Sequence, residues 1–177
     1  SNFNLTTTQL NGSGSLVVNG TSTTGFTVSS NSSGYTGAIT IDKSDLPQFN
    51  AGAGGMVIGG ANGALLNVPS IDIRSGGTLT LQNSTSANSN GNRLGDTVPI
   101  NLRSGNLSLG ASTVGLTETV GAITGAGYST ITSSPGSAGT ATLAAASLAR
   151  SDRGTFLFRG TALGGAAAVR GNITFAS

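Results

Sequence analysis

Cysteine, histidine and tryptophan are all absent from this chain of 177 residues. Without cysteine the chain has no disulfide framework, no thiolate metal site and no thiol nucleophile. Without histidine it has no histidine-based triad, metal site or general base. We therefore expect no enzymatic activity, no catalytic or cofactor-binding residues, no metal ligands and no cofactor.

Charge is also scarce, at 8% of residues against about 25% in an average globular domain. Lys43 is the single lysine, and the seven arginines are scattered along the chain. Nucleic-acid binding requires clustered basic residues that neutralise phosphates, so we predict no nucleic-acid partner.

Long apolar runs are missing too, and we predict no membrane span. No signal peptide is recognisable, so we expect either that a targeting segment was removed or that the chain is a fragment of something longer.

What is present is glycine, with 29 residues, together with many serine, threonine and asparagine residues. Apolar residues make up 36% and occur in short alternating groups, a pattern that buries a core and argues against disorder. Low charge, no cysteine and abundant small polar residues are typical of bacterial surface proteins. We therefore expect an extracellular or cell-surface location.

Short strands are the main secondary-structure signal, because apolar residues repeat with a period of two and turn-formers lie between the groups. Residues 141–150 are the best helix candidate, with a strand as the alternative. The remaining strands are predicted at residues 14–18, 38–41, 71–73, 77–81, 99–102, 105–109, 120–123, 129–132, 155–158 and 172–175.

One unit, Arg-Ser-Gly followed by Leu-x-Leu, occurs at residues 74–81 and again at 103–109. Leu79 and Leu107 are 28 residues apart, and a short strand precedes each unit. Strand, glycine corner and strand at this period predict one coil of a parallel β-helix, stacked on the next. The alternative is a β-sandwich or jelly roll in which Arg-Ser-Gly-Gly is a hairpin turn. In either case, we expect residues 1–177 to form a single all-β domain.

A more specific pattern is Asn92-Arg93-Leu94-Gly95-Asp96, followed by a strand, by residues 105–109 and by Glu118-Thr119-Val120-Gly121. It resembles the autotransporter-associated β-strand repeat, best over about residues 70–165, and Tyr35-Thr36-Gly37 resembles a second phrase of that family. The resemblance implies a right-handed parallel β-helix in a long, secreted bacterial repeat protein, and it carries over no catalytic residues.

The few charged residues have simple structural interpretations. We expect Asp72 to be a solvated outward strand residue, Asp42 and Asp45 to flank Lys43 in a loop, and Asp96 to cap a turn.

The best enzymatic candidate is the run 150–153 with Arg159, which we interpret as a polar turn with an internal ion pair. Its single acid is too few for glycoside hydrolysis. The glycine-rich run 51–63 is interpreted as a loop, because no nucleotide-binding motif follows it.

The sequence therefore predicts a structural or adhesive surface protein, a solenoid segment that self-associates into a filament or layer. Strand pairing at the two ends, near residues 5–7 and 173–175, would make it a homo-oligomer or polymer. Cell-surface glycans are further expected partners.

Two alternatives stay open. One is a carbohydrate-binding module or polysaccharide-lyase-like enzyme with an exposed Tyr35 or Tyr128 beside an Asp/Arg groove. The other is an ice-binding protein, which requires Thr-x-Thr pairs to align on one face. In the sequence the four pairs are separated unevenly, by 39, 13 and 10 residues.

Overall fold

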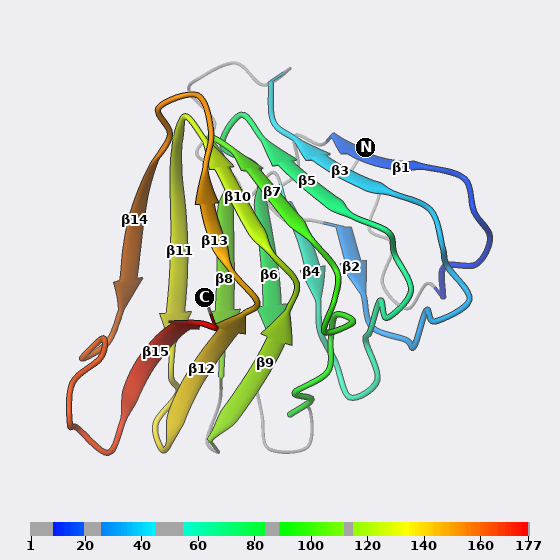
Figure 1. Cartoon of the computed structure of the whole chain (residues 1–177). Coiled ribbons are helices and arrows are strands. Elements are labelled where there is room, and N and C mark those ends of the chain that lie inside the picture. The colour runs from blue at the N-terminus through cyan, green and yellow to red at the C-terminus, as the bar shows by residue number, and fades with distance from the viewer. Residues whose placement is uncertain (1–8, 20–25, 45–54, 84–88, 112–114, 177) are drawn as a thin grey trace.

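The computed structural model describes residues 9–19, 26–44, 55–83, 89–111 and 115–176. These residues form fifteen β strands and no helix, and every strand pair is parallel (Figure 1). The predicted all-β fold is confirmed.

Three parallel sheets make up the structure (Figure 1). The first sheet contains, in order, β1 (Leu16–Asn19), β3 (Ile39–Asp42), β5 (Ile71–Arg74), β7 (Ile100–Arg103), β10 (Ile123–Ala126) and β13 (Leu148–Arg150). The second contains β2 (Phe26–Val28), β4 (Gly55–Ile58), β6 (Thr78–Gln82), β8 (Asn106–Gly110), β11 (Tyr128–Ser134) and β14 (Thr155–Gly160). The third contains β9 (Leu116–Val120), β12 (Thr140–Ala145) and β15 (Arg170–Phe175).

Strands that follow one another in the chain lie in different sheets, so the chain winds as a β-solenoid of about 5 turns. This confirms the stacked-coil prediction.

The core is a set of side-chain ladders inside the coils. Each strand alternates, so residues of one parity point inward and stack on the equivalent residues of the next coil. In the first sheet Ile39, Ile71 and Ile100 are in register, and all three are buried. In the second sheet Leu79 and Leu107 stack in the same way. Each such side chain stabilises the fold by about 1.5–3 kcal/mol through burial.

The Arg-Ser-Gly unit forms a corner between two sheets. The chain passes from β5 to β6 through Ser75, and from β7 to β8 through Ser104, with φ of 52° and 58° at the two serines. The Ser75 N–H donates to the Arg103 carbonyl at 3.0 Å, so one corner stacks on the next. The strands that it joins belong to different parallel sheets, and the hairpin-turn alternative is therefore wrong.

Residues 141–150 are extended, in β12 and β13, which confirms the strand alternative. Residues 120–123 are not one strand, because β9 ends at Val120 and a bend leads into β10 at Ile123. The run 51–63 is not simply a loop: residues 55–58 are β4, with Met56 and Ile58 fully buried, while residues 51–54 lie outside the described part.

We expect Gly105→Ala to destabilise the fold, because a Cβ at this corner would lie 2.5 Å from the Ile73 carbonyl oxygen of the preceding coil. Backbone cannot move away cheaply, and such overpacking costs about 1–3 kcal/mol. Urea unfolding measures the change. The matched control is Gly110→Ala, where no atom lies within 4 Å of the added Cβ. Equal midpoints for the two variants would contradict the corner-stacking argument.

Candidate functional site

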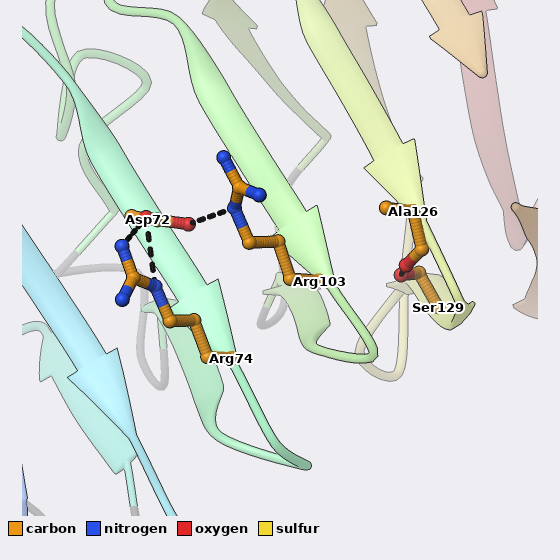
Figure 2. Close-up of polar contacts among 5 residues, drawn as sticks. All are labelled: Asp72, Arg74, Arg103, Ala126 and Ser129. Atoms are coloured by element: carbon orange, nitrogen blue, oxygen red, sulfur yellow. Dashed lines mark hydrogen bonds and ion pairs between the residues drawn. The ribbon is translucent and has the colours of Figure 1, made fainter. Parts of the chain in front are cut away.

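The most polar surface feature is a cluster of Asp72, Arg74 and Arg103 on the outer face of the first sheet (Figure 2). Arg74 donates from Nε to Asp72 Oδ2 at 2.8 Å and also contacts it through Nη2. Arg103 comes from the next coil, and its Nε lies 3.3 Å from Asp72 Oδ1. The outward position predicted for Asp72 is confirmed, but its carboxylate is paired across two coils rather than simply solvated.

This surface cluster contributes little to the stability of the fold. The Asp72 side chain retains 15% of its exposure, and the two arginine side chains retain 44% and 59%. Exposed ion pairs of this kind contribute about 0–1 kcal/mol. Figure 2 also shows the corner one coil further along, where the Ser129 hydroxyl donates to the Ala126 carbonyl at 3.4 Å. The cluster links two neighbouring coils, and each carboxylate oxygen of Asp72 is paired with one arginine.

A second charged group lies inside the solenoid. The Arg93 side chain is fully buried, and it donates to Asn83 Oδ1 at 3.0 Å, to the Gly63 carbonyl at 2.8 Å and to the Gly60 carbonyl at 2.8 Å. The planar guanidinium suits three acceptors held in fixed directions. Burial lowers the pKa of Arg93, and the nearby charge of Glu118 opposes that shift.

Glu118 completes this group from the following coil. Its Oε1 accepts the backbone N–H groups of Arg93 at 2.9 Å and Leu94 at 2.8 Å, and the Glu118 side chain is fully buried. Burial raises the pKa of the Glu118 carboxyl to about 7, while the two N–H groups and the Arg93 charge act in the opposite direction. Asp96 adds a small further rise. We call Asn83, Arg93 and Glu118 the clasp.

The clasp lies where the third sheet begins. Glu118 is an inward residue of β9, at the ladder position that Leu143 and Ile173 occupy in the next two coils. The preceding coil has bends and an isolated β-bridge, Leu65 with Leu94, here instead of a strand, and Gly91 packs against the Thr117 carbonyl. The carboxylate therefore accepts the N–H groups that this segment directs toward β9. The clasp thus holds two successive coils together through hydrogen bonds.

Sequence reasoning did not bring Arg93 and Glu118 together, although both lie in the repeat-like motif. One signal was available: in Leu116-Thr117-Glu118, the alternation places the carboxylate on the same inward parity as Leu116. A carboxylate at a core position requires a partner. The 25-residue separation of Arg93 and Glu118, about one coil, then indicates where that partner lies.

The other predicted charged residues are spread along the chain. Asp42 ends β3, where its carboxylate accepts the Ser44 N–H at 2.8 Å, and this bond lowers its pKa. Asp45 lies outside the described residues. Asp96 is in a turn, as predicted, but its carboxylate accepts no hydrogen bond from the described residues, so it does not cap that turn.

The predicted ion pair within residues 150–153 is wrong. The salt bridges among the described residues all involve Asp72, and Asp152 makes none. Asp152 and Arg153 both adopt positive φ, 46° and 57°, at the corner that Ser75 and Gly76 form three coils earlier. That backbone sends the charged side chains outward, where they are exposed.

Tyr35 and Tyr128 differ completely in exposure. Tyr35 is 5% exposed, and its hydroxyl donates to the Gly14 carbonyl of the preceding coil at 2.6 Å. It therefore fastens two coils and is not available to stack on a sugar. Tyr128 begins β11 and is 60% exposed, in register with Thr155 just after the Arg153 corner.

The threonine pairs align far better in space than in sequence. Thr80, Ser108 and Thr132 form one row on the outer face of the second sheet, and Thr78, Asn106 and Thr130 form the row beside it. On the third sheet Thr117 and Thr142 are neighbours. The uneven gaps in the sequence were therefore misleading, because they mixed pairs from two different sheets.

The last coil leaves an apolar groove open. Its aromatic rings form a chain in which the centroids of Phe156 and Phe158 lie 6.0 Å apart and those of Phe158 and Phe175 lie 5.9 Å apart. Beside them lies a cavity of about 290 Å³, lined by Phe158, Leu163, Gly164, Asn172, Ile173, Thr174 and Phe175.

Within the described ranges, no group of three or more acidic side chains is placed to hold a metal ion, and no helix is long and apolar enough to cross a membrane. Comparison with family models, curated proteins and solved structures finds no match to the chain. Support for the parallel β-helix that the repeat-like motif implied thus comes from the observed stacking of the sheets.

We expect the clasp to make stability fall between about pH 5 and pH 7. The pKa of Glu118 is raised from 4.5 in the unfolded chain to about 7 in the fold, so folding retains a proton in this window. Stability from this group is complete below pH 4.5 and declines by up to about 3 kcal/mol as the pH rises through 7. Urea unfolding at several pH values measures it.

The control for this pH dependence is Glu118→Gln, which removes the titrating group. Because the chain lacks histidine, few other groups titrate in this window. The variant should be less pH-dependent than the wild type between pH 5 and 8, whatever its absolute stability. Parallel curves for the two proteins would show that Glu118 does not titrate as argued.

We also expect Arg93→Lys to be strongly destabilising, although it preserves the charge. A lysine ammonium cannot reach all three acceptors that Arg93 satisfies, and each buried acceptor left unpaired costs about 1–3 kcal/mol. Thermal unfolding followed by circular dichroism measures the loss. The control is Arg103→Lys, an exposed position where a change within about 0.5 kcal/mol is expected. Similar losses of stability at both sites would contradict the need for a guanidinium at position 93.

Proposed function

We propose that this chain is a structural or adhesive segment of an extracellular, cell-surface protein of bacterial origin. On this proposal it acts as a stiff solenoid that self-associates into a filament or layer. The observation that carries the proposal is the stacking of parallel strands in three sheets, whose end strands pair on one side only among the described residues. Each coil depends only on its neighbours, so such a structure extends by adding identical interfaces.

The surface composition supports this role. In β6, β8 and β11 the outer rows of the second sheet are hydroxyl and amide side chains, and charged residues are 8% of the chain. Two groups of charged residues link neighbouring coils. The clasp joins two coils inside the solenoid, and the Asp72 cluster joins two coils on its outer face. The motif likeness to autotransporter-associated repeats adds support for secretion and surface display.

Self-association is tested on the purified 177-residue chain by electron microscopy and light scattering. We expect filaments or layers, and a scattering mass that grows with protein concentration. Open strand edges with apolar neighbours provide the physical reason. Single particles of constant mass over the whole concentration range would contradict the proposal.

One observation favours ice binding as a second candidate, because the threonine and serine rows of the second sheet are in register. Parallel strands place these hydroxyls about 4.8 Å apart across the sheet and about 6.6 Å apart along each strand. Inhibition of ice growth that is lost in Ser108→Tyr, at the centre of the array, would favour this function. No inhibition by the wild-type chain would remove it.

A carbohydrate-binding role, or a lyase-like activity, rests on Tyr128. Its exposed ring lies just beyond the Arg153 corner, and an aromatic face with arginine nearby suits an acidic sugar. Calorimetric titration with acidic oligosaccharides tests it, with Arg153→Ala and Tyr128→Ala as variants. Absence of binding heat, and of cleavage, removes this candidate.

A further inference from the structure

The last coil presents an unpartnered face of three strand edges. Among the described strands, β13, β14 and β15 pair only with β10, β11 and β12. The Thr155 N–H donates back to the Gly127 carbonyl at 2.7 Å. Because N–H directions alternate along a strand, those of Phe156 and Phe158 point away from the solenoid. We call this face, with the groove of about 290 Å³ beside Phe158, the tail.

The first coil presents the complementary face, which we call the head. Here β1 and β2 pair only with β3 and β4 among the described strands. The Leu16 N–H donates to the Ala38 carbonyl at 2.9 Å, so the N–H of Val17 points outward from the edge. Leu16, Val18 and Phe26 are apolar and only partly buried, and they begin ladders that have no member on their outer side within the described part of the chain.

The ladders indicate how the two faces fit. The first-sheet ladder runs from Leu16 to Leu148, and the second-sheet ladder runs from Phe26 to Phe158. A head placed on a tail continues both ladders, leucine on leucine and phenylalanine on phenylalanine. It also continues the first and second sheets in the parallel sense, while the third sheet, which contains only β9, β12 and β15, has no strand at the head among the described residues. Two tails placed face to face would instead meet as antiparallel edges.

The distribution of charge favours head-to-tail docking over tail-to-tail docking. Residues 148–176 contain one aspartate and four arginines, namely Arg150, Arg153, Arg159 and Arg170, a net charge of +3. Residues 1–70 contain no arginine and carry a net charge of −1 from Lys43, Asp42 and Asp45. Asp42 is in register with Asn19 at the end of β1, so a carboxylate lies near the head edge. A tail therefore attracts a head and repels a second tail.

We infer that the tail of one copy docks on the head of a second copy, so that the chain polymerises head to tail with a single polarity. Leu163 and Phe158 cover the joint on the tail side, and the edge of β1 receives β13 of the neighbouring copy. This inference rests on the proposed self-association and specifies its geometry. A contact of this heterologous kind does not close on itself, so it produces filaments.

The test uses one variant that blocks each face. Val17→Pro removes an outward N–H from the edge strand at a side chain that is 63% exposed, and Val17→Thr is its control. Leu163→Asp places a carboxylate in the tail groove, where Leu163 is 38% exposed. Leu157→Asp, on the outer face of the same coil at 37% exposure, is the matched control. Circular dichroism melting checks that each variant folds.

Sedimentation velocity then distinguishes the outcomes. Head-to-tail docking predicts that each blocked variant alone is a monomer, that a 1:1 mixture of the two forms dimers and nothing larger, and that both controls assemble like the wild type. A Val17→Pro variant that dimerises without its partner would show tail-to-tail pairing and overturn the inference alone. A wild-type chain that stays monomeric would overturn the self-association itself.

Salt provides a second measurement that does not depend on how the variants fold. Raising ionic strength from about 0.01 M to about 0.3 M shortens the Debye length from about 30 Å to below 10 Å. The dissociation constant of the wild-type head-to-tail assemblies should then rise, because salt screens the attraction between tail and head. Assemblies that strengthen with salt would indicate that like-charged tails meet, and would overturn the inference.

Discussion

The rest of the structure depends on backbone hydrogen bonding between successive coils. Parallel strands lie about 4.8 Å apart, so every residue sits directly above its equivalent in the next coil. This spacing decides what each position accepts. Inward positions take stacked aliphatic side chains, and corners take residues that let a carbonyl of the neighbouring coil come close. Gly105 against the Ile73 carbonyl and Gly121 against the Thr97 carbonyl are two such corners. Composition follows from this, with much glycine and little charge.

The clasp shows how the same spacing accommodates a change of cross-section. Among the described strands the third sheet starts at β9, and the coil before it has bends and an isolated β-bridge at the corresponding place. The N–H groups of that segment are buried against β9 and need acceptors, and an apolar side chain at residue 118 would leave them unpaired. The Glu118 carboxylate supplies those acceptors, and the nearby positive charge of Arg93 reduces the cost of burying it. The buried charges are thus a consequence of adding a sheet in mid-solenoid.

Alternation and corner residues were sufficient to predict most strands and the stacked-coil fold. The strand β4 was missed because Met56-Val57-Ile58 is enclosed by glycines that resemble a loop signal. Contacts between coils were harder, since the coils differ in length: from Ile39 to Ile71 is 32 residues, and from Ile100 to Ile123 is 23. A fixed period of 28 residues therefore misaligns distant positions. That is why the threonine rows and the clasp emerged only from the strand register.

The interior of the solenoid narrows toward the last coil. Gly125 and Ser133 occupy inward positions where the preceding coil carries the larger side chains of Leu102 and Leu109. The Phe156 ring packs against Gly125, where a Cβ would collide with it. Part of the last coil thus fills the coil beneath it. Phe158 and Leu163 are less covered, at 38% exposure each, although the Phe158 ring stacks on Phe156. Their exposed apolar surface is therefore available for contact between copies.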